Sequence, residues 1–167
     1  SIVEGYAAME YTDHMIYDTL TNQLLSYSLH EKLVSALSVD EGKWSLSERQ
    51  LDEPRYYNHA RTFNPSDSSF YFFGGYGFYQ YRNNLYRLKV GMKQVEEVAY
   101  TPVISPRYSS AAAIVGDELY IFGGRGNKQG KQEFNAHFSY ELCAINLKTG
   151  KSRSVWKKKQ PTDMLLM

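Results

Sequence analysis

Hydrophobic positions in this chain fall in short runs that are separated by polar turns. Residues 70–73 (FYFF) and 119–122 (LYIF) are continuously apolar, which is typical of strands buried on both faces. Residues 83–90, 140–147 and 152–156 form further short runs, bounded by Asn, Gly and other turn residues. No segment longer than ten residues keeps an apolar stripe at helical spacing. The pattern therefore predicts an all-β fold.

The chain contains an internal repeat. Two segments begin with Pro-Arg-Tyr, at Pro54 and Pro106, and continue into an apolar strand, a polar turn and an aromatic strand that ends in Gly-Gly. The two copies lie about 50 residues apart, and each offers four short strands. This period and strand count are those of one blade of a β-propeller.

A third, more divergent copy precedes these two, over residues 14–50. It can be divided into four short strands, and the turn beside Trp44 resembles the turn before Trp156. It has no Gly-Gly doublet, and His30 and Glu31 stand there instead. We therefore predict one partial propeller of about three four-stranded antiparallel blades, at about residues 14–51, 58–101 and 109–157.

The doublets and the aromatic strands resemble the kelch repeat. In that family a Gly-Gly doublet closes the second strand, an aromatic residue follows in the third strand, and a tryptophan lies near the fourth. The matching residues are Gly74, Gly75 and Tyr86 in the middle unit, Gly123, Gly124 and Trp156 in the last, and Trp44 in the first. The resemblance implies that the glycines are structural and that the tryptophans pack between blades.

Three blades would leave two blade faces uncovered, because closed propellers of this type have four to eight blades. If each face exposed about 400 Å² of apolar surface, leaving it in water would cost about 10 kcal/mol at ~25 cal/mol per Å². The whole stability of a typical domain is only roughly 5–15 kcal/mol. We therefore expect the open faces to be covered by the remainder of the same propeller or by another copy of the chain.

Charge and composition bear on partners and compartment. The 19 basic and 18 acidic residues give a formal net charge of +1, so nothing favours nucleic acid as a partner. No run of about 18 apolar residues is present, so we expect no membrane insertion. Cys143, the only cysteine, lies in an apolar strand and is expected to be a buried, inert thiol. A chain without disulfides fits the cytoplasm and bacterial export alike, and an exported (periplasmic or extracellular) location is slightly favoured.

Candidate binding residues lie in two kinds of loop. In a propeller, the loops before each first strand and the loops between second and third strands share one face, around the central channel. Arginine offers a planar fork for carboxylates, and tyrosine offers a stacking surface with a polar tip, so such a set suits a glycan, an acidic sugar or a peptide. The candidate ligand-binding residues are Arg55, Tyr57, His59, Tyr79, Tyr81, Arg82, Arg107, Arg125 and His137.

Several of these residues also have a structural interpretation. Arg55 and Arg107 occupy the Pro-Arg position of kelch repeats, where the side chain often braces neighbouring loops. His59 lies near the start of a first strand, where a structural role is favoured. Tyr79, Tyr81 and Arg82 have no counterpart in the repeat, which raises the weight of a functional role for them.

We expect no metal site, no cofactor and no catalytic residue. His14 and His137 have no metal-binding spacing with any neighbour, and no Gly-x-Ser-x-Gly, phosphate-loop or His-Glu-x-x-His motif is present. The copper centre of galactose oxidase-like members needs a cysteine crosslinked to a tyrosine, and Cys143 has no such company. Glu133 with Arg55 or Arg107 is the only suggestion of an acid–base pair.

The resemblance implies no single activity, because kelch propellers include ubiquitin-ligase adaptors, actin binders, galactose oxidase-like enzymes and sialic acid mutarotases. The leading hypothesis is a non-catalytic binding scaffold that recognises a protein or carbohydrate ligand through loops around the propeller channel. One alternative is a carbohydrate-active enzyme of kelch-propeller type, such as a sugar mutarotase. The other is a structural module of a larger multidomain protein.

Overall fold

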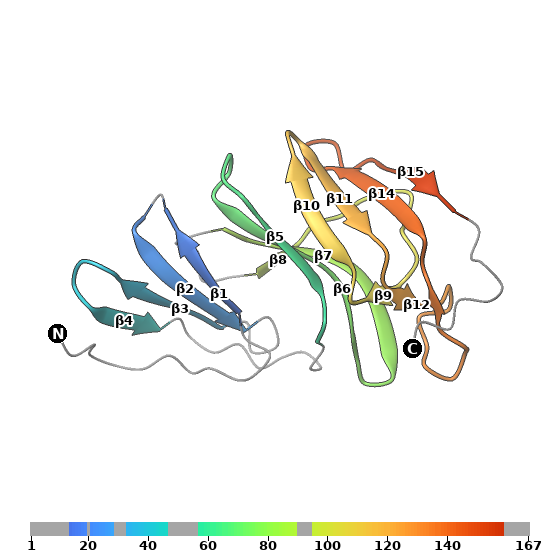
Figure 1. The fold of residues 1–167 in the computed structure, drawn as a ribbon, viewed down its shortest axis with the longest axis horizontal. Coiled ribbons are helices and arrows are strands. Elements are labelled where there is room, and N and C mark those ends of the chain that lie inside the picture. The colour runs from blue at the N-terminus through green and yellow to red at the C-terminus, as the bar shows by residue number, and fades with distance from the viewer. Residues whose placement is uncertain (1–13, 20, 29–32, 47–56, 90–94, 159–167) are drawn as a thin grey trace. The chain divides into compact units, whose positions relative to one another are not determined.

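The computed structural model describes residues 14–19, 21–28, 33–46, 57–89 and 95–158, and every regular element in these ranges is a β-strand (Figure 1). The strands form three four-stranded antiparallel sheets and one small three-stranded sheet. The prediction of an all-β fold built from four-stranded antiparallel sheets is confirmed, and it is consistent with a fragment of a β-propeller. Within the described ranges no helix is long and apolar enough to cross a membrane. One compact unit holds the first sheet and a second unit holds the other three.

The first sheet is an up-and-down meander near the N-terminus. Its strands, in the order β1-β2-β3-β4, are β1 His14–Asp18, β2 Gln23–Ser28, β3 Leu33–Ser38 and β4 Lys43–Leu46. Asn22, at a φ of 52° in the β1–β2 turn, donates from Nδ2 to Asp40 Oδ1 at 2.8 Å and so ties this turn to the β3–β4 turn. Leu25 is buried on one face of the sheet, whereas Met15 and Tyr17 lie on the other face and are about half exposed.

The second sheet follows the same plan but has a much longer central hairpin. Its strands, in the order β5-β6-β7-β8, are β5 Ala60–Asn64, β6 Ser69–Gly77, β7 Gln80–Lys89 and β8 Val95–Glu97. The sequence pattern predicts a loop directly after Gly75, but the structure differs, because β6 continues to Gly77 and β7 begins at Gln80. Gly74 and Gly75, at φ values of 70° and 115°, produce a shift of register that bends the strand without ending it.

The third sheet resembles the second in strand order and has a long insertion in its centre. Its strands, in the order β10-β11-β14-β15, are β10 Ala111–Val115, β11 Glu118–Phe122, β14 Glu141–Asn146 and β15 Ser152–Lys157. The small sheet, in the order β13-β12-β9, consists of β9 Arg107–Tyr108, β12 Arg125–Gly126 and β13 His137–Phe138. The sequence pattern did not predict these three two-residue strands, because they are too short to show an alternation of polar and apolar positions.

The second and third sheets share one hydrophobic core, and Figure 1 shows them side by side, in green and in yellow to red. Phe73 and Leu85 from the second sheet meet Ile121, Cys143 and Ile145 from the third, and all five are almost fully buried. The predicted burial of Cys143 is therefore confirmed. Burial, followed by the nearby charge of Glu141, raises the pKa of this thiol to about 11, so it stays protonated at neutral pH.

The predicted packing of the two tryptophans between blades stays a prediction. Trp156 on β15 is 48% exposed, and Trp44 on β4 is only partly buried. The expected inter-blade contact of Trp156 is therefore not found among the described residues. The reason is that Trp156 lies on the face of the third sheet that points away from the second sheet.

Candidate functional site

The tip of the β6–β7 hairpin displays two aromatic rings at an unusual backbone geometry. Phe78 and Tyr79 form its two-residue turn with φ values of 50° and 60°, and their side chains are 62% and 75% exposed. Turns of this kind favour Asn-Gly, because both central residues need positive φ. A bulky residue in that region costs of order 1–3 kcal/mol, and such residues cluster at functional sites. The hairpin tip is therefore a candidate binding element.

The hairpin is fixed in place by the long connection between β12 and β13. Tyr81 N donates to Gly130 O at 2.8 Å, and Gln132 N donates to Tyr79 O at 2.8 Å. Tyr76 adds a side-chain bond, from its hydroxyl to Gln132 Oε1. These bonds join the connections between second and third strands of two successive sheets, as the propeller interpretation expects for loops on one face.

Three tyrosines from different strands meet beside this junction. The ring centres of Tyr76, Tyr81 and Tyr108 lie 5.5, 5.8 and 5.6 Å apart in pairs, and the rings of Tyr81 and Tyr108 are stacked with an interplanar angle of 9°. Tyr81 is 8% exposed, and burial, followed by the nearness of Tyr108 and Tyr76, raises its pKa. Its hydroxyl therefore stays protonated at neutral pH and remains a hydrogen-bond donor.

The tyrosines line an open hollow of about 430 Å³, here named the tyrosine pocket. It is lined by Tyr76, Tyr81, Tyr108, Arg125, Gln132, Phe134, Asn135 and Ala136. Arg125 is exposed, and its guanidinium carbon lies 5.5 Å from the ring centre of Phe138, which holds the head group near the pocket. A second hollow of about 500 Å³ adjoins the hairpin tip and shares Gln132 with the tyrosine pocket.

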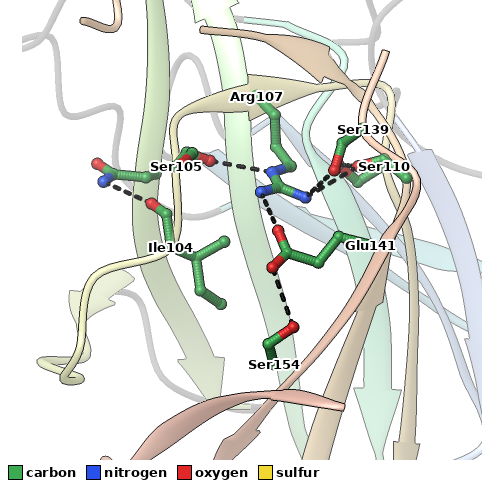
Figure 2. A network of polar contacts seen from close by, with 9 residues as sticks. Ile104, Ser105, Arg107, Ser110, Ser139, Glu141 and Ser154 are labelled. Atoms are coloured by element: carbon green, nitrogen blue, oxygen red, sulfur yellow. Dashed lines mark hydrogen bonds and ion pairs between the residues drawn. The ribbon is translucent and has the colours of Figure 1, made fainter. Parts of the chain in front are cut away.

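Arg107 is a structural brace in this structure (Figure 2). It is 3% exposed, and its guanidinium donates to Ser105 O at 3.0 Å and to Ser139 Oγ at 2.8 Å. It also donates to Gly123 O at 3.3 Å and to Glu141 Oε2 at 3.1 Å. These bonds direct its donors into the protein, which supports the bracing interpretation over ligand contact.

The partner of Arg107, Glu141, is stabilised as a carboxylate. Burial raises its pKa, but hydrogen bonds from Arg107 and Ser154 and the charge of Arg107 outweigh that effect. Its pKa therefore lies below the usual range of glutamate, and the ion pair is intact at neutral pH. Figure 2 shows Glu141 between Arg107 and Ser154, which donates to its other oxygen at 3.1 Å.

The structure brings only some of the predicted residues together. Tyr81 and Arg125 line the tyrosine pocket, and Tyr79 lies at the hairpin tip. Tyr57 pairs through its main chain with Tyr76, by bonds of 2.7 and 2.8 Å, and its side chain does not line the pocket. His59 packs edge-on against Phe72, with ring centres 5.4 Å apart.

The remaining predicted residues lie elsewhere. Arg82 is on β7 opposite Gly75 and is partly buried. His137, on β13, lines a separate hollow of about 620 Å³, whose wall includes Arg107. Arg55 lies outside the described residues.

Sequence reasoning missed important parts of the pocket. Tyr108, from the second Pro-Arg-Tyr segment, was not among the candidate residues, yet its ring stacks on Tyr81. Gln132, Phe134 and Ala136 lie in a polar insertion that has no counterpart in the middle repeat. The lack of a counterpart in the middle repeat was the one sequence feature that could have identified these three residues as candidates for a binding site.

The suggested acid–base pair of Glu133 with Arg107 is not formed, and the alternative pair with Arg55 lies outside the described residues. Glu133 lies 3.6 Å from Lys131 Nζ in an exposed ion pair, while Arg107 binds Glu141. Among the described residues, no group of three or more His, Cys, Asp or Glu side chains could hold a metal ion.

The sequence matches no model of a known protein family, and no curated protein is significantly similar to it. The class of the protein is therefore defined by its fold, which consists of antiparallel four-stranded sheets in an all-β chain.

Proposed function

We propose that this protein is a non-catalytic binding module of the kelch-propeller type and that its tyrosine pocket recognises a carbohydrate. The observation that carries the proposal is the convergence of Tyr76, Tyr81 and Tyr108 with Arg125 around one open hollow. The kelch assignment is supported by the two Gly-Gly doublets, the period of about 50 residues and the shared order of strands in the sheets.

The lining of the tyrosine pocket suits the chemistry of a sugar. A pyranose ring has an apolar face of C–H groups that packs against an aromatic ring, and hydroxyls that require both donors and acceptors. The tyrosines supply ring surface, and the amides of Gln132 and Asn135 supply donors and acceptors. Arg125 adds a planar fork for a carboxylate. A hollow of about 430 Å³ falls within the range of small-molecule sites.

Binding is favoured over catalysis because the pocket lacks groups that transfer protons readily at neutral pH. None of its described lining residues is Asp, Glu, His, Cys or Lys. Tyr81, whose pKa is raised by burial, is a poor general base. The lining therefore gives no specific support to a sugar mutarotase.

A glycan array probed with the labelled protein tests the proposal, followed by calorimetry with any sugar that binds. Arg125→Ala and Asn135→Ala are each expected to weaken binding about tenfold or more, with an unchanged melting temperature, because both side chains line the pocket and are exposed. Val103→Ala is the matched control, since Val103 is 68% exposed and lies outside the pocket. The proposal is wrong if no glycan binds, if only a protein ligand is found, or if NMR shows turnover of a bound sugar.

A further inference from the structure

The third sheet has two unlike faces. Its inner face, which includes Ile114, Leu119, Ile121 and Ile145, packs against the second sheet. The opposite, outer face is defined by Ala111, Val115, Tyr120, Phe122, Leu142 and Trp156. Phe122 and Trp156 are each 48% exposed and Val115 is 67% exposed, so this face presents apolar side chains to solvent. It also carries the ion pair of Glu118 and Arg153 at one end of the strands.

The second sheet shows how the equivalent face of the preceding repeat is covered. In the second sheet, Ala60, Phe73 and Leu85 form a cross-strand row that corresponds to the row of Ala111, Phe122 and Leu142 in the third. Phe73 and Phe122 each directly precede a Gly-Gly doublet, which fixes the correspondence. The row in the second sheet is 0–3% exposed, because the inner face of the third sheet lies on it. The outer face of the third sheet is therefore the same surface without such a cover.

A glycine at the end of each row gives a second, independent observation. Gly74 and Gly123 have nearly equal φ values of 70° and 69°. A Cβ atom added at Gly74 would come closer than 3.0 Å to the carbonyl oxygen of Arg107, because β9 runs directly against this glycine. At Gly123 the nearest heavy atom outside its own segment is Ser139 O, at 3.7 Å. In the second sheet, the next part of the chain covers both the row of side chains and the space beside Gly74. The third sheet has the same row and the same space beside Gly123, and the described residues leave both uncovered.

The complementary surface is present on the same chain, in the first sheet. The last residue of β1, Asp18, pairs with the first of β2, as Val115 of β10 pairs with the first residue of β11. Met15 and Tyr17 therefore correspond to Ala112 and Ile114, which lie on the inner face of the third sheet. Met15 is 46% exposed and Tyr17 is 51% exposed. The contact between the second and third sheets joins two kinds of sheet face. The chain exposes one more face of each kind, on the outer side of the third sheet and on the Met15 side of the first sheet.

We propose that the outer face of the third sheet docks on the first sheet of a second copy of this chain, as the third sheet docks on the second. A face of four strands about 4.8 Å apart and five residues long measures about 19 by 17 Å, which is the scale of an interaction patch. The contact joins two different surfaces, so each added copy would leave one of them free and a filament would grow. A closed ring of copies avoids this. The described residues of two copies would supply six four-stranded sheets, within the four to eight blades of closed propellers. The assembly goes beyond the proposed carbohydrate binding and does not depend on it.

Light scattering coupled to gel filtration tests the assembly directly. The chain is expected to elute with twice the 19.3 kDa of one copy. Phe122→Asp is expected to raise the dissociation constant about a hundredfold or more, because it places a charge at the centre of an apolar contact. Val103→Asp, which changes an exposed residue outside both faces, is the control and leaves the mass unchanged. Circular dichroism checks the fold of each variant, and Val115→Asp replaces Phe122→Asp if the latter fails to fold.

A mixing experiment tests whether two different faces meet. Tyr17→Asp alters the first sheet, so it is expected to produce monomers as Phe122→Asp does. Each variant keeps the face that the other has lost, so an equal mixture is expected to form a two-chain complex by native mass spectrometry. A monomeric wild-type chain overturns the proposal, as does a dimer that survives Phe122→Asp. Failure of the two variants to combine overturns it as well.

Discussion

The second and third sheets carry the same repeat, but equivalent positions have opposite surroundings. Phe73 and Phe122 each precede a glycine doublet and each lie in a cross-strand row, and their side chains are 1% and 48% exposed. The repeat therefore decides which side chains share a face, whereas the neighbouring sheet decides whether that face is buried. The same contrast separates Gly74, against which β9 runs, from Gly123, which has space around it.

The largest expected difference is between Phe73→Ala and Phe122→Ala. Removing the buried ring of Phe73 is expected to lower the free energy of unfolding by about 3–5 kcal/mol, because it leaves a cavity in the shared core. Removing the half-exposed ring of Phe122 is expected to cost about 1 kcal/mol or less in the monomer. Urea denaturation at a protein concentration low enough to exclude assembly measures both. Equal losses would break the comparison.

The next difference concerns the polar residues that directly precede the corresponding leucines, Leu142 in the third sheet and Leu85 in the second. Glu141→Gln in the third sheet is expected to cost about 2–4 kcal/mol, because buried Arg107 would lose its charged partner. Asn84→Ala in the second sheet removes a 2.7 Å bond to the exposed Glu97 and is expected to cost less than about 1 kcal/mol. Urea midpoints at pH 7 compare the two variants. A larger loss for Asn84→Ala would contradict the bracing role of Arg107.

Acid sensitivity is expected to follow from the same ion pair. The pKa of folded Glu141 lies below its ordinary value, so the folded state gains stability above that value. This stability is lost as pH falls from the ordinary value of about 4.5 through the lower pKa of the folded protein. Melting temperatures measured from pH 6 to about pH 3 are therefore expected to fall less steeply for Glu141→Gln than for the wild type. Parallel curves would show that the pair contributes nothing to acid unfolding.

Replacing Gly74 and Gly123 with alanine tests the comparison of the two sheets at the level of the backbone. Both glycines have positive φ, so each change costs about 1 kcal/mol through conformation alone. Gly74→Ala is expected to cost about 1–3 kcal/mol more, because the new methyl group would collide with the carbonyl of Arg107. Thermal unfolding of the two variants at a concentration low enough to exclude assembly gives the difference. An equal or greater loss for Gly123→Ala under these conditions would break the comparison.

The smallest effect is expected at the hairpin tip, where the second sheet has a two-residue turn and the third has a long connection. Replacing Phe78 with Asn and Tyr79 with Gly is expected to raise the free energy of unfolding by about 1 kcal/mol, because these residues accept positive φ more readily. Urea denaturation of the double variant measures the change. A loss of stability would mean that the exposed rings serve to hold the hairpin together.

Local sequence patterns predicted the strands well, because strand formation follows short-range alternation and turn chemistry. The apolar runs at residues 70–73 and 119–122 fall within β6 and β11. Their predicted burial on both faces holds for β6 and fails for Phe122 in β11. The failure has a physical cause, since burial of the outer face requires a covering sheet that lies beyond the local sequence.

The candidate site was less accessible to sequence reasoning. Tyr81 and Arg125 were identified from residue type and position, but Tyr76 was passed over as a candidate. Its role depends on main-chain pairing with Tyr57 and a side-chain bond to Gln132, which is 56 residues away. The glycine doublet also gave an incomplete signal. It ends β11, but in β6 it only bends the strand, because β7 keeps pairing beyond it through Gly77 and Gln80.

The short strand β9 makes two consecutive repeats inseparable. It precedes the third sheet in the chain, yet its backbone lies against Gly74 of the second, and Ser109 N just after it donates to Asn58 O at 2.7 Å. Its Arg107 side chain is anchored to Glu141 of the third sheet. Neither repeat can open without disturbing this strand, so their amide hydrogens should exchange with solvent in a single cooperative event. A repeat excised at the sequence boundary would therefore lose part of its own fold, and damage to one repeat would be transmitted to the other.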